Sequence, residues 1–214
     1  MTPFQAEREQ MVEYQIARRG IDDDRVLDAM RKVPRHLFVS PEACAYAYAD
    51  SPIRIGSGQT ISQPYIVALM TQLLAVESNH RVLDVGTGSG YQAAILGELA
   101  KDVHTIERHP ALAAEAEIRL AELGYHNVHV HVGDGTRGYA PAAPYDRIVV
   151  AAAAPSVPPS LKSQLADGGR LVIPVGSRRS QRLEVWDREG EEHHRSSSIS
   201  VIFVPLIGED GWEG

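Results

Sequence analysis

The apolar positions of this chain follow two spacings, and the change from one to the other predicts its elements. From Arg81 onward, short apolar runs bounded by turn residues alternate with stretches whose apolar residues recur at helical spacing. Short apolar runs are typical of buried parallel strands, and their alternation with helices predicts a parallel sheet with right-handed crossovers. Strands are expected near 81–86, 102–107, 127–132, 146–152 and 169–175, and helices near 89–100, 110–124 and 158–166.

The two ends of the chain depart from this alternation. Residues 7–18 and 25–32 have helical spacing, and the acidic run 22–24 supplies an N-terminal cap for the second of these helices. Past Gly176, apolar residues in 183–186 and 199–206 indicate strands without helices between them, which fits an antiparallel edge on a parallel sheet. The predicted fold is therefore α/β: a doubly wound, mostly parallel, Rossmann-like sheet with antiparallel C-terminal strands and an N-terminal helical segment.

We expect one domain over residues 1–214, because a chain of 214 residues is long enough for one substantial core. Its parts are a helical region at 1–80 with an irregular Gly-, Pro- and Ser-rich loop at 50–65, an α/β core at 81–176, and C-terminal strands and a tail at 177–214. The glycine-rich tail is expected to be mobile, so that Asp210 can isomerise at its bond to Gly211.

Charge and composition narrow the range of partners. The net charge is −7, whereas proteins that hold nucleic acid present a basic face, and the one basic cluster, at 178–182, is interpreted as an exposed hairpin turn. No apolar stretch approaches the ~20 residues that span a bilayer, and no signal peptide is evident. We therefore expect no nucleic acid and no membrane among its partners. The single Cys44 leaves no internal disulfide and favours the cytoplasm, and a monomer is expected by default.

Five histidines lie between residues 104 and 131, which raises the question of a metal. His129 and His131 alternate with valines, so both belong on one face of a strand. No third ligand falls at a useful spacing beside them, and we expect no metal site.

Segment 82–91, Val-Leu-Asp-Val-Gly-Thr-Gly-Ser-Gly-Tyr, carries the clearest sign of a ligand. Glycines at the carboxyl end of a strand let the backbone pass close to a bound molecule, and this is where open α/β sheets form nucleotide pockets. A dinucleotide fingerprint would need glycine at 91, where Tyr91 stands. Glu107 ends the next apolar segment, about 20 residues further on, where a carboxylate can accept both hydroxyls of a ribose.

The pattern Asp-x-Gly-x-Gly-x-Gly resembles the first motif of the S-adenosylmethionine (SAM)-dependent methyltransferases. The resemblance implies SAM as cofactor and S-adenosyl-L-homocysteine as product, with Asp84 and Gly86 beside the methionine end. It also implies that an oxygen of Asp134 accepts from the adenine amine. The expected cofactor-binding residues are Asp84, Gly86, Thr87, Gly88, Ser89, Gly90, Glu107, Asp134 and Gly135.

Segments 50–52 and 55–65, the second ending Thr-Ile-Ser-Gln-Pro-Tyr, closely resemble the signature of the protein-L-isoaspartate (D-aspartate) O-methyltransferases. Segments 29–39, 131–135 and 203–206 are similar too, so that the resemblance runs from Met11 to Leu206. It implies methylation of the free α-carboxylate of L-isoaspartyl and D-aspartyl residues in damaged proteins. A succinimide then forms and can reopen to normal aspartate.

The chemistry agrees with this resemblance. A carboxylate with a pKa of ~3.9 is already ionised at neutral pH, so the reaction needs alignment and removal of water more than a general base. Ser62 matches the family's active-site serine and is assigned to orienting the substrate carboxylate; capping the helix that follows is an alternative that stays open. The expected substrate-binding residues are Thr60, Ile61, Ser62, Gln63 and Val204.

Some positions depart from the family's usual pattern, namely Thr136, Ala151, Ala154 and Ile202. They leave peptide preference and turnover open. Two alternative functions are a methyltransferase for another carboxylate or small molecule, and a SAM-binding module without turnover.

Overall fold

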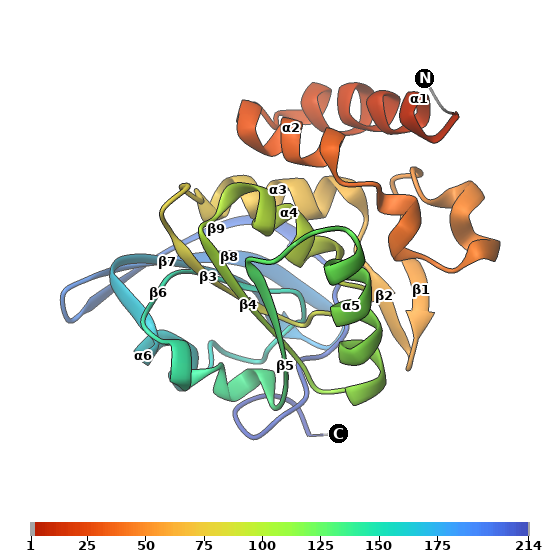
Figure 1. Cartoon of the computed structure of the whole chain (residues 1–214). Coiled ribbons are helices and arrows are strands. Elements are labelled where there is room, and N and C mark those ends of the chain that lie inside the picture. Colours follow the sequence, from red (N-terminus) through yellow and green to blue (C-terminus); the bar gives the residue numbers. More distant parts are fainter. Residues whose placement is uncertain (1–2, 214) are drawn as a thin grey trace.

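The computed structural model describes residues 3–213, and within them seven strands form one sheet in the order β5-β4-β3-β6-β7-β8-β9 (Figure 1). The strands from β5 to β7 in this order are parallel, and β8 and β9 are antiparallel. This confirms the predicted fold class. The strands are β3 (Arg81–Val85), β4 (Asp102–Glu107), β5 (Val128–Val132), β6 (Tyr145–Val150), β7 (Leu165–Ser177), β8 (Ser180–Glu189) and β9 (Glu192–Val201).

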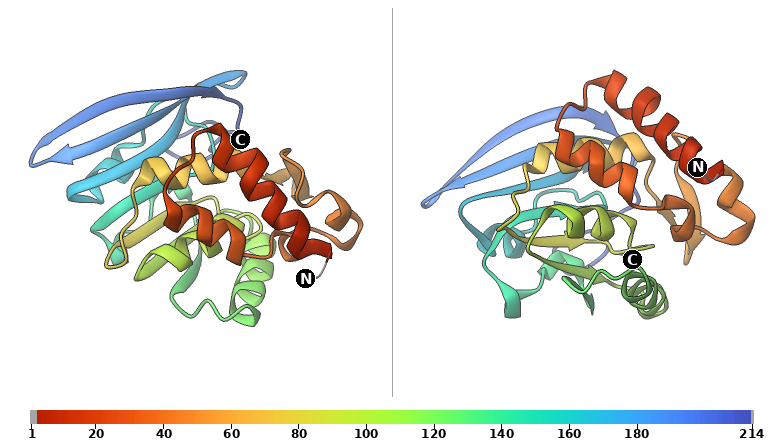
Figure 2. Two further views of the ribbon diagram at one scale, coloured as in Figure 1. Left: turned by 90° about the horizontal axis from the view of Figure 1, so that it is seen from above. Right: turned by 45° about the horizontal axis from the view of Figure 1, so that its top comes forward.

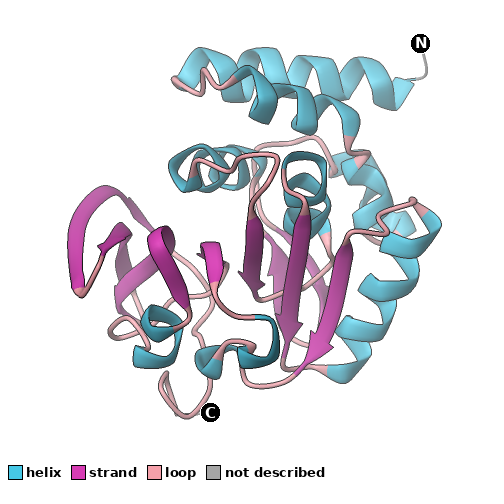
Figure 3. Ribbon diagram, turned by 60° about the vertical axis from the view of Figure 1, so that its left-hand side comes forward, coloured by secondary structure: helices cyan, strands magenta, loops and turns pink. Residues whose placement is uncertain are grey.

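Helices cover both faces of this sheet (Figure 3). On one face lie α3 (Pro64–Leu74) and α4 (Tyr91–Leu99), packed against the core that contains Val82. On the other lies α6 (Pro159–Ser163), packed against the core that contains Leu83. Neighbouring residues of one strand thus enter opposite cores, as the pleat requires. The helix α5 (Pro110–Glu122) packs against β4 and β5.

The N-terminal residues form an outer helical layer over α3 and α4 (Figures 1 and 2). The expected helix at 7–18 is part of a longer stretch: α1 (Pro3–Gln10), a π-helical segment (Met11–Ile16) and a 3₁₀ turn (Ala17–Arg19). The expected helix at 25–32 is α2 (Asp24–Lys32), and its cap is Asp23, whose side chain accepts from the Arg25 backbone N–H. The acidic run therefore caps this helix as predicted.

The loop at 50–65 is more regular than expected. Part of it forms a hairpin of β1 (Ile53–Gly56) and β2 (Gln59–Ile61), in which Ile53 pairs with Ile61. The two-residue turn is possible because Ser57 and Gly58 adopt φ angles of 48° and 72°, and glycine allows that region without strain. Ser57 and Gly58 make the turn, and Ile53 and Ile61 pair across it.

Two C-terminal predictions are wrong in extent. The helix expected at 158–166 ends at Ser163, because Leu165 already pairs with Tyr145 as the start of β7. The strand expected at 199–206 is the end of β9, which begins at Glu192 in a polar stretch that no apolar pattern marks. The apolar segment beyond it leaves the sheet, and the Ala153 N–H donates to the Val204 carbonyl at 2.8 Å.

The C-terminal tail is packed, which corrects the expected mobility. The Asp210 N–H donates to Thr136 Oγ1 at 3.1 Å, and the Gly211 N–H donates to the Gly208 carbonyl at 3.1 Å. Further on, the Trp212 indole N–H donates to the Ala153 carbonyl at 3.0 Å. Taken over residues 3–213, the fold contains no helix with the length and apolarity to cross a membrane.

Candidate active site

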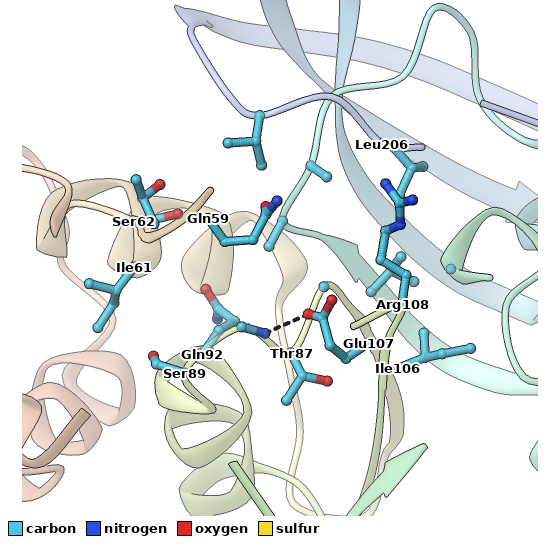
Figure 4. Close-up of a pocket in the computed structure, with 18 of the residues that line it drawn as sticks. Gln59, Ile61, Ser62, Thr87, Ser89, Gln92, Ile106, Glu107, Arg108 and Leu206 are labelled. Atoms are coloured by element: carbon cyan, nitrogen blue, oxygen red, sulfur yellow. Dashed lines mark hydrogen bonds between the residues drawn. The ribbon is translucent and has the colours of Figure 1, made fainter. Parts of the chain in front are cut away.

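A cavity opens at the carboxyl ends of β3, β4 and β6, where the strand order reverses (Figure 4). In open α/β sheets, ligands bind at this switch point. The glycine loop after β3 forms one wall, β2 and the residues after it form a second, and segment 204–207 forms a third. Residues from both early and late parts of the sequence therefore meet over the sheet. The predicted site residues in the lining are Thr60, Ile61, Ser62, Gly86, Thr87, Gly88, Ser89, Glu107, Gly135 and Val204.

The glycine loop has the conformation that the sequence pattern predicts. Gly86 and Gly88 have φ angles of 101° and 52°, in the left-handed region that favours glycine. A Cβ on Gly88 would lie 3.3 Å from Ile55 Cδ1, tighter than ordinary van der Waals contact. The loop therefore passes close to the β1–β2 hairpin, and glycine leaves the space beside its backbone open for a ligand.

Glu107 lies at the end of β4, as expected, and is 5% exposed. Its Oε2 accepts the Gly88 N–H at 2.9 Å (Figure 4), and its Oε1 accepts the His109 N–H at 3.0 Å. A carboxylate has about four acceptor positions, so each oxygen keeps one for a ligand. These two remaining positions suit the neighbouring hydroxyls of a ribose.

Asp84 lies beneath the cavity and does not line it. The residue is fully buried, its Oδ2 accepts from Thr105 Oγ1 at 2.8 Å, and its Oδ1 has no partner among residues 3–213. Thr105 Oγ1 also shares a hydrogen bond of 2.7 Å with Thr87 Oγ1, which connects Asp84 to a residue of the lining. The pKa of Asp84 is raised to about 7. Burial is the main cause and the Glu107 charge acts in the same direction, whereas the hydrogen bond from Thr105 acts to lower the pKa.

Asp134 also lies outside the cavity lining. Its Oδ1 accepts the backbone and hydroxyl protons of Thr136 at 2.9 and 2.7 Å, and its Oδ2 accepts the Glu209 N–H at 2.8 Å. Burial acts to raise the pKa of Asp134, but the hydrogen bonds from Glu209 and Thr136 outweigh it and lower the pKa. Asp134 thus holds the C-terminal tail in place, next to the part of the site where adenine is expected. Gly90 also lies outside the lining, at the start of α4.

Ser62 lies in the second wall, between β2 and α3. The N-cap of α3 is Gln63 and makes no side-chain capping bond, so Ser62 does not cap this helix. Within the described residues 3–213, the Ser62 hydroxyl has no hydrogen-bond partner and is left for a ligand. Gln63 itself lines a neighbouring cleft, which shares Thr60 and Ser62 with the cavity.

Arg35 holds this second wall from below. It is fully buried, its Nε donates to the Ala47 carbonyl and its Nη2 to the Ser62 carbonyl, each at 2.8 Å. The guanidinium lies 4.8 Å from the centre of the Tyr91 ring, at the start of α4. Burial lowers the pKa of Arg35, while Tyr91 raises it. One side chain therefore ties the Ser62 backbone to the helix that follows the glycine loop.

Several lining residues were not predicted. Gln59, Gln92 and Arg108 contribute polar groups, and Leu206 and Ile207 contribute an apolar wall (Figure 4). Gln59 and Arg108 are next to predicted residues, which is a usable signal. Nothing local marks Gln92 or Ile207, because their place in the wall depends on packing between distant segments.

The departures from the family's usual pattern occupy different environments. Thr136 is fully buried, and its hydroxyl links Asp134 to the tail. Ala151 lines both the cavity and the neighbouring cleft, and Ala154 is buried in the core. Ile202 is 80% exposed at the edge of the cleft.

The residues present fit a nucleoside cofactor with a ribose diol. The cavity offers a buried carboxylate with two acceptor positions left, a glycine turn for close approach and apolar walls such as Ile106 and Leu206. A Cβ on Gly135 would lie 2.6 Å from Val85 Cγ1, so this position also has room only for glycine. Together with the strand order, these features define the Rossmann-like methyltransferase class of α/β proteins.

Comparisons with known proteins give the family within this class. The family model described as protein-L-isoaspartate(D-aspartate) O-methyltransferase (PCMT) matches residues 6–211. The chain belongs to this family, as its motifs indicate. It is similar to the protein-L-isoaspartate O-methyltransferase of Methanoculleus marisnigri, with 56% identity over 99% of this chain and 96% of the relative. The corresponding protein of Methanoregula boonei is 56% identical over 99% of this chain and 97% of its own.

Solved structures agree in fold. A structure named protein-L-isoaspartate O-methyltransferase superimposes with a TM-score of 0.85 at 27% identity, over 95% of this chain and 67% of that chain. A Plasmodium falciparum structure named for the same activity has a TM-score of 0.82 at 26% identity, over 94% of this chain and 98% of that chain. That crystal structure is in complex with S-adenosyl-L-homocysteine.

Proposed function

We propose that this protein is a repair methyltransferase, which transfers a methyl group from SAM to the free α-carboxylate of L-isoaspartyl and D-aspartyl residues in damaged proteins. A succinimide then forms and reopens in part to aspartate. The observation that carries this proposal is the shared wall between the cavity and its neighbouring cleft, where Ser62 stands with a hydroxyl free of partners within residues 3–213.

The cavity is assigned to SAM. Glu107 would hold the ribose hydroxyls, the loop of Gly86 to Gly90 would pass beside the methionine end, and Gly135 would face the adenine. Asp134 would act from outside the lining, because its Oδ1 already accepts two bonds, whereas its Oδ2 accepts one and keeps a position for the adenine amine. Asp84 would support the loop through Thr105 and Thr87. When bound, SAM supplies an electrophilic methyl group for an in-line displacement.

The substrate side has to align a carboxylate and exclude water. The Ser62 hydroxyl would donate to one oxygen of the substrate carboxylate and turn the other toward the cavity. Thr60, Ile61 and Val204 would bound the space around it, and Gln63 would contact the peptide in the cleft. Arg35 would keep Ser62 in place by holding its backbone carbonyl. This arrangement needs no general base, because the nucleophile is already ionised at neutral pH.

We also propose that the protein acts as a monomer in the cytoplasm, without nucleic acid or membrane. The net charge of −7 and the single cysteine support this assignment.

The test is methyl transfer from labelled SAM to two synthetic peptides that differ only in isoaspartate or aspartate at one position. We expect label in the isoaspartyl peptide alone. Label in neither peptide, with SAM binding intact, would favour another acceptor or a SAM-binding role without turnover.

The same assay tests Ser62. We expect Ser62→Ala to lower kcat/KM for the isoaspartyl peptide by about tenfold or more, the equivalent of one hydrogen bond to a charged group. Its SAM affinity and melting temperature should match the wild type, because Ser62 does not cap α3. A large loss of melting temperature with unchanged kcat/KM would assign the residue to structure instead.

A further inference from the structure

The cleft beside the cavity has walls from three distant parts of the chain. The start of α3 supplies Tyr65 and Ile66, the end of β9 and the segment after it supply 199–204, and the β7–β8 turn supplies Arg179 and Ser180. We name it the flank cleft. It joins the cavity through Thr60, Ser62, Ala151 and Val204, which line both. A substrate carboxylate at Ser62 would therefore leave its neighbouring residues in the flank cleft.

The charges of the flank cleft differ from those of the molecule. The chain has a net charge of −7, yet the described residues that line this cleft include two arginines, Arg19 and Arg179, and no carboxylate. Arg19 is already engaged: it pairs with Asp50 and lies 3.6 Å from the centre of the Tyr65 ring. Its charge is therefore largely balanced.

Arg179 differs from Arg19 in having no partner for its charge. It is exposed near the tip of the turn between β7 and β8, a pair of long strands at one side of the sheet (Figure 2). Within residues 3–213, no carboxylate, carbonyl or ring contacts its guanidinium. Its neighbour Arg178 instead donates to the Glu213 carbonyl at 2.8 Å and lies by Trp212, away from the cleft. Arg179 thus offers an unbalanced positive charge at the edge of a cleft that also exposes Ile202.

We propose that the flank cleft holds the residues next to isoaspartate in the substrate, and that Arg179 selects an acidic side chain there. This inference rests on the proposed function and names the kind of substrate that the site prefers. The net charge of the molecule acts in the opposite direction, because a negative protein attracts basic peptides at long range. A preference for acidic peptides would therefore have to come from a local group.

The experiment uses isoaspartyl peptides that are identical except for Glu or Lys, placed on either side of the isoaspartate. For one of the two sides, we expect the wild type to have a kcat/KM about fivefold higher with Glu than with Lys, the size of a partly exposed charge contact. High salt should reduce this ratio toward one, because exposed charges are screened.

Three variants separate Arg179 from its surroundings. Arg179→Gln should abolish the ratio, Arg179→Glu should reverse it, and Arg178→Gln, next to it in the chain, should keep it. All three should retain the SAM affinity, because neither arginine lines the cavity. Equal kcat/KM for the Glu and Lys peptides in the wild type, or a ratio unchanged in Arg179→Glu, would overturn the inference alone. If none of the isoaspartyl peptides were methylated, the proposed function itself would fail.

Discussion

Glu107 has a double task. Its two oxygens accept backbone N–H groups from the glycine loop and from the start of the segment before α5, and they also face the cavity. The same carboxylate therefore shapes the glycine loop and offers acceptors to a ligand. Loss of this side chain should therefore change the glycine loop and weaken ligand binding.

We expect Glu107→Ala to weaken SAM binding by at least tenfold, since about 2–4 kcal/mol is lost with two hydrogen bonds to a charged group. Isothermal titration calorimetry measures this directly. Glu107→Gln keeps one acceptor oxygen, so its SAM affinity should lie between those of the wild type and Glu107→Ala. The exposed Glu117 on α5 gives a control, and Glu117→Ala should bind SAM as the wild type does. An unchanged dissociation constant in Glu107→Ala would contradict the assignment of the ribose.

Residues at strand ends were the easiest to predict. Glu107 and the loop after β3 follow apolar runs, and the carboxyl ends of parallel strands meet at one edge of a sheet. Arg35 was part of a matching segment, but nothing in its neighbours indicates that it reaches the Ser62 carbonyl. Asp134 was predicted at the right edge, yet its bond to the tail depends on Glu209, 75 positions later, a distance along the chain that local patterns do not encode.

Among the elements, β4 and β5 carry a cluster of histidines. His104 Nδ1 and His131 Nε2 share a hydrogen bond of 2.9 Å, and the His131 ring stacks on Tyr139 with 3.6 Å between centroids. His129 lies 3.2 Å from a carboxylate oxygen of Asp102. Both expected strand histidines do share one face, where Tyr139 stacks on His131 and on His104 while His129 stays exposed.

This cluster makes the stability of the fold sensitive to acid. Burial, followed by the charges of His104 and His129, lowers the pKa of His131 from 6.5 to about 4. The unfolded chain therefore binds more protons than the folded one between about pH 6.5 and 4, and the free energy of unfolding falls as the pH falls through that window. Above pH 6.5 the contribution is fully present.

We expect His131→Phe, which keeps a ring for Tyr139, to lose less stability than the wild type between pH 6.5 and 4. Urea denaturation at a series of pH values measures this slope. The exposed His126 offers a control, and His126→Asn should keep the wild-type slope. Equal slopes in His131→Phe and the wild type would remove His131 from the acid response.

The prediction of elements succeeded where an apolar period was present. The parallel strands β3 to β6 lie within about two residues of their expected bounds. For β3, β4 and β6 the reason is their burial in the middle of the sheet, whereas the edge strand β5 is marked by its alternating valines. β9 was missed over most of its length, because the outermost strand of the described sheet needs few apolar residues and reads Glu-His-His-Arg-Ser-Ser-Ser. The hairpin β1–β2 was hidden by its own turn residues, which by composition alone indicate a loop.

At the scale of the molecule, one continuous core runs from the outer helical layer through α3 and α4 into the sheet, from Met11 to Val201. We propose on this basis that residues 1–214 form a single domain. The tail then closes the opposite face, held by Thr136, Ala153 and Ser160.

This closure should protect the Asp210–Gly211 bond from isomerisation. The reaction needs the Gly211 nitrogen to attack the Asp210 side chain, but that N–H is hydrogen-bonded to the Gly208 carbonyl. We expect isoaspartate at 210 to accumulate more slowly in the folded protein than in a peptide copying residues 207–214. Trp212→Ala, which removes the bond to Ala153, should accelerate it. Peptide mapping of aged samples measures both, and equal rates in all three would show that the tail gives no protection.

The walls of the cavity come from residues 59–62 and from residues 204–207, with the sheet between them. During translation, almost the whole chain must therefore be synthesised before residues 204–207 can complete the cavity. A product of premature termination before Val204 would contain the glycine loop and Glu107 but lack the wall that faces them. We therefore expect chains truncated before Val204 to bind SAM more weakly than the finished chain, because one wall of the cavity is missing.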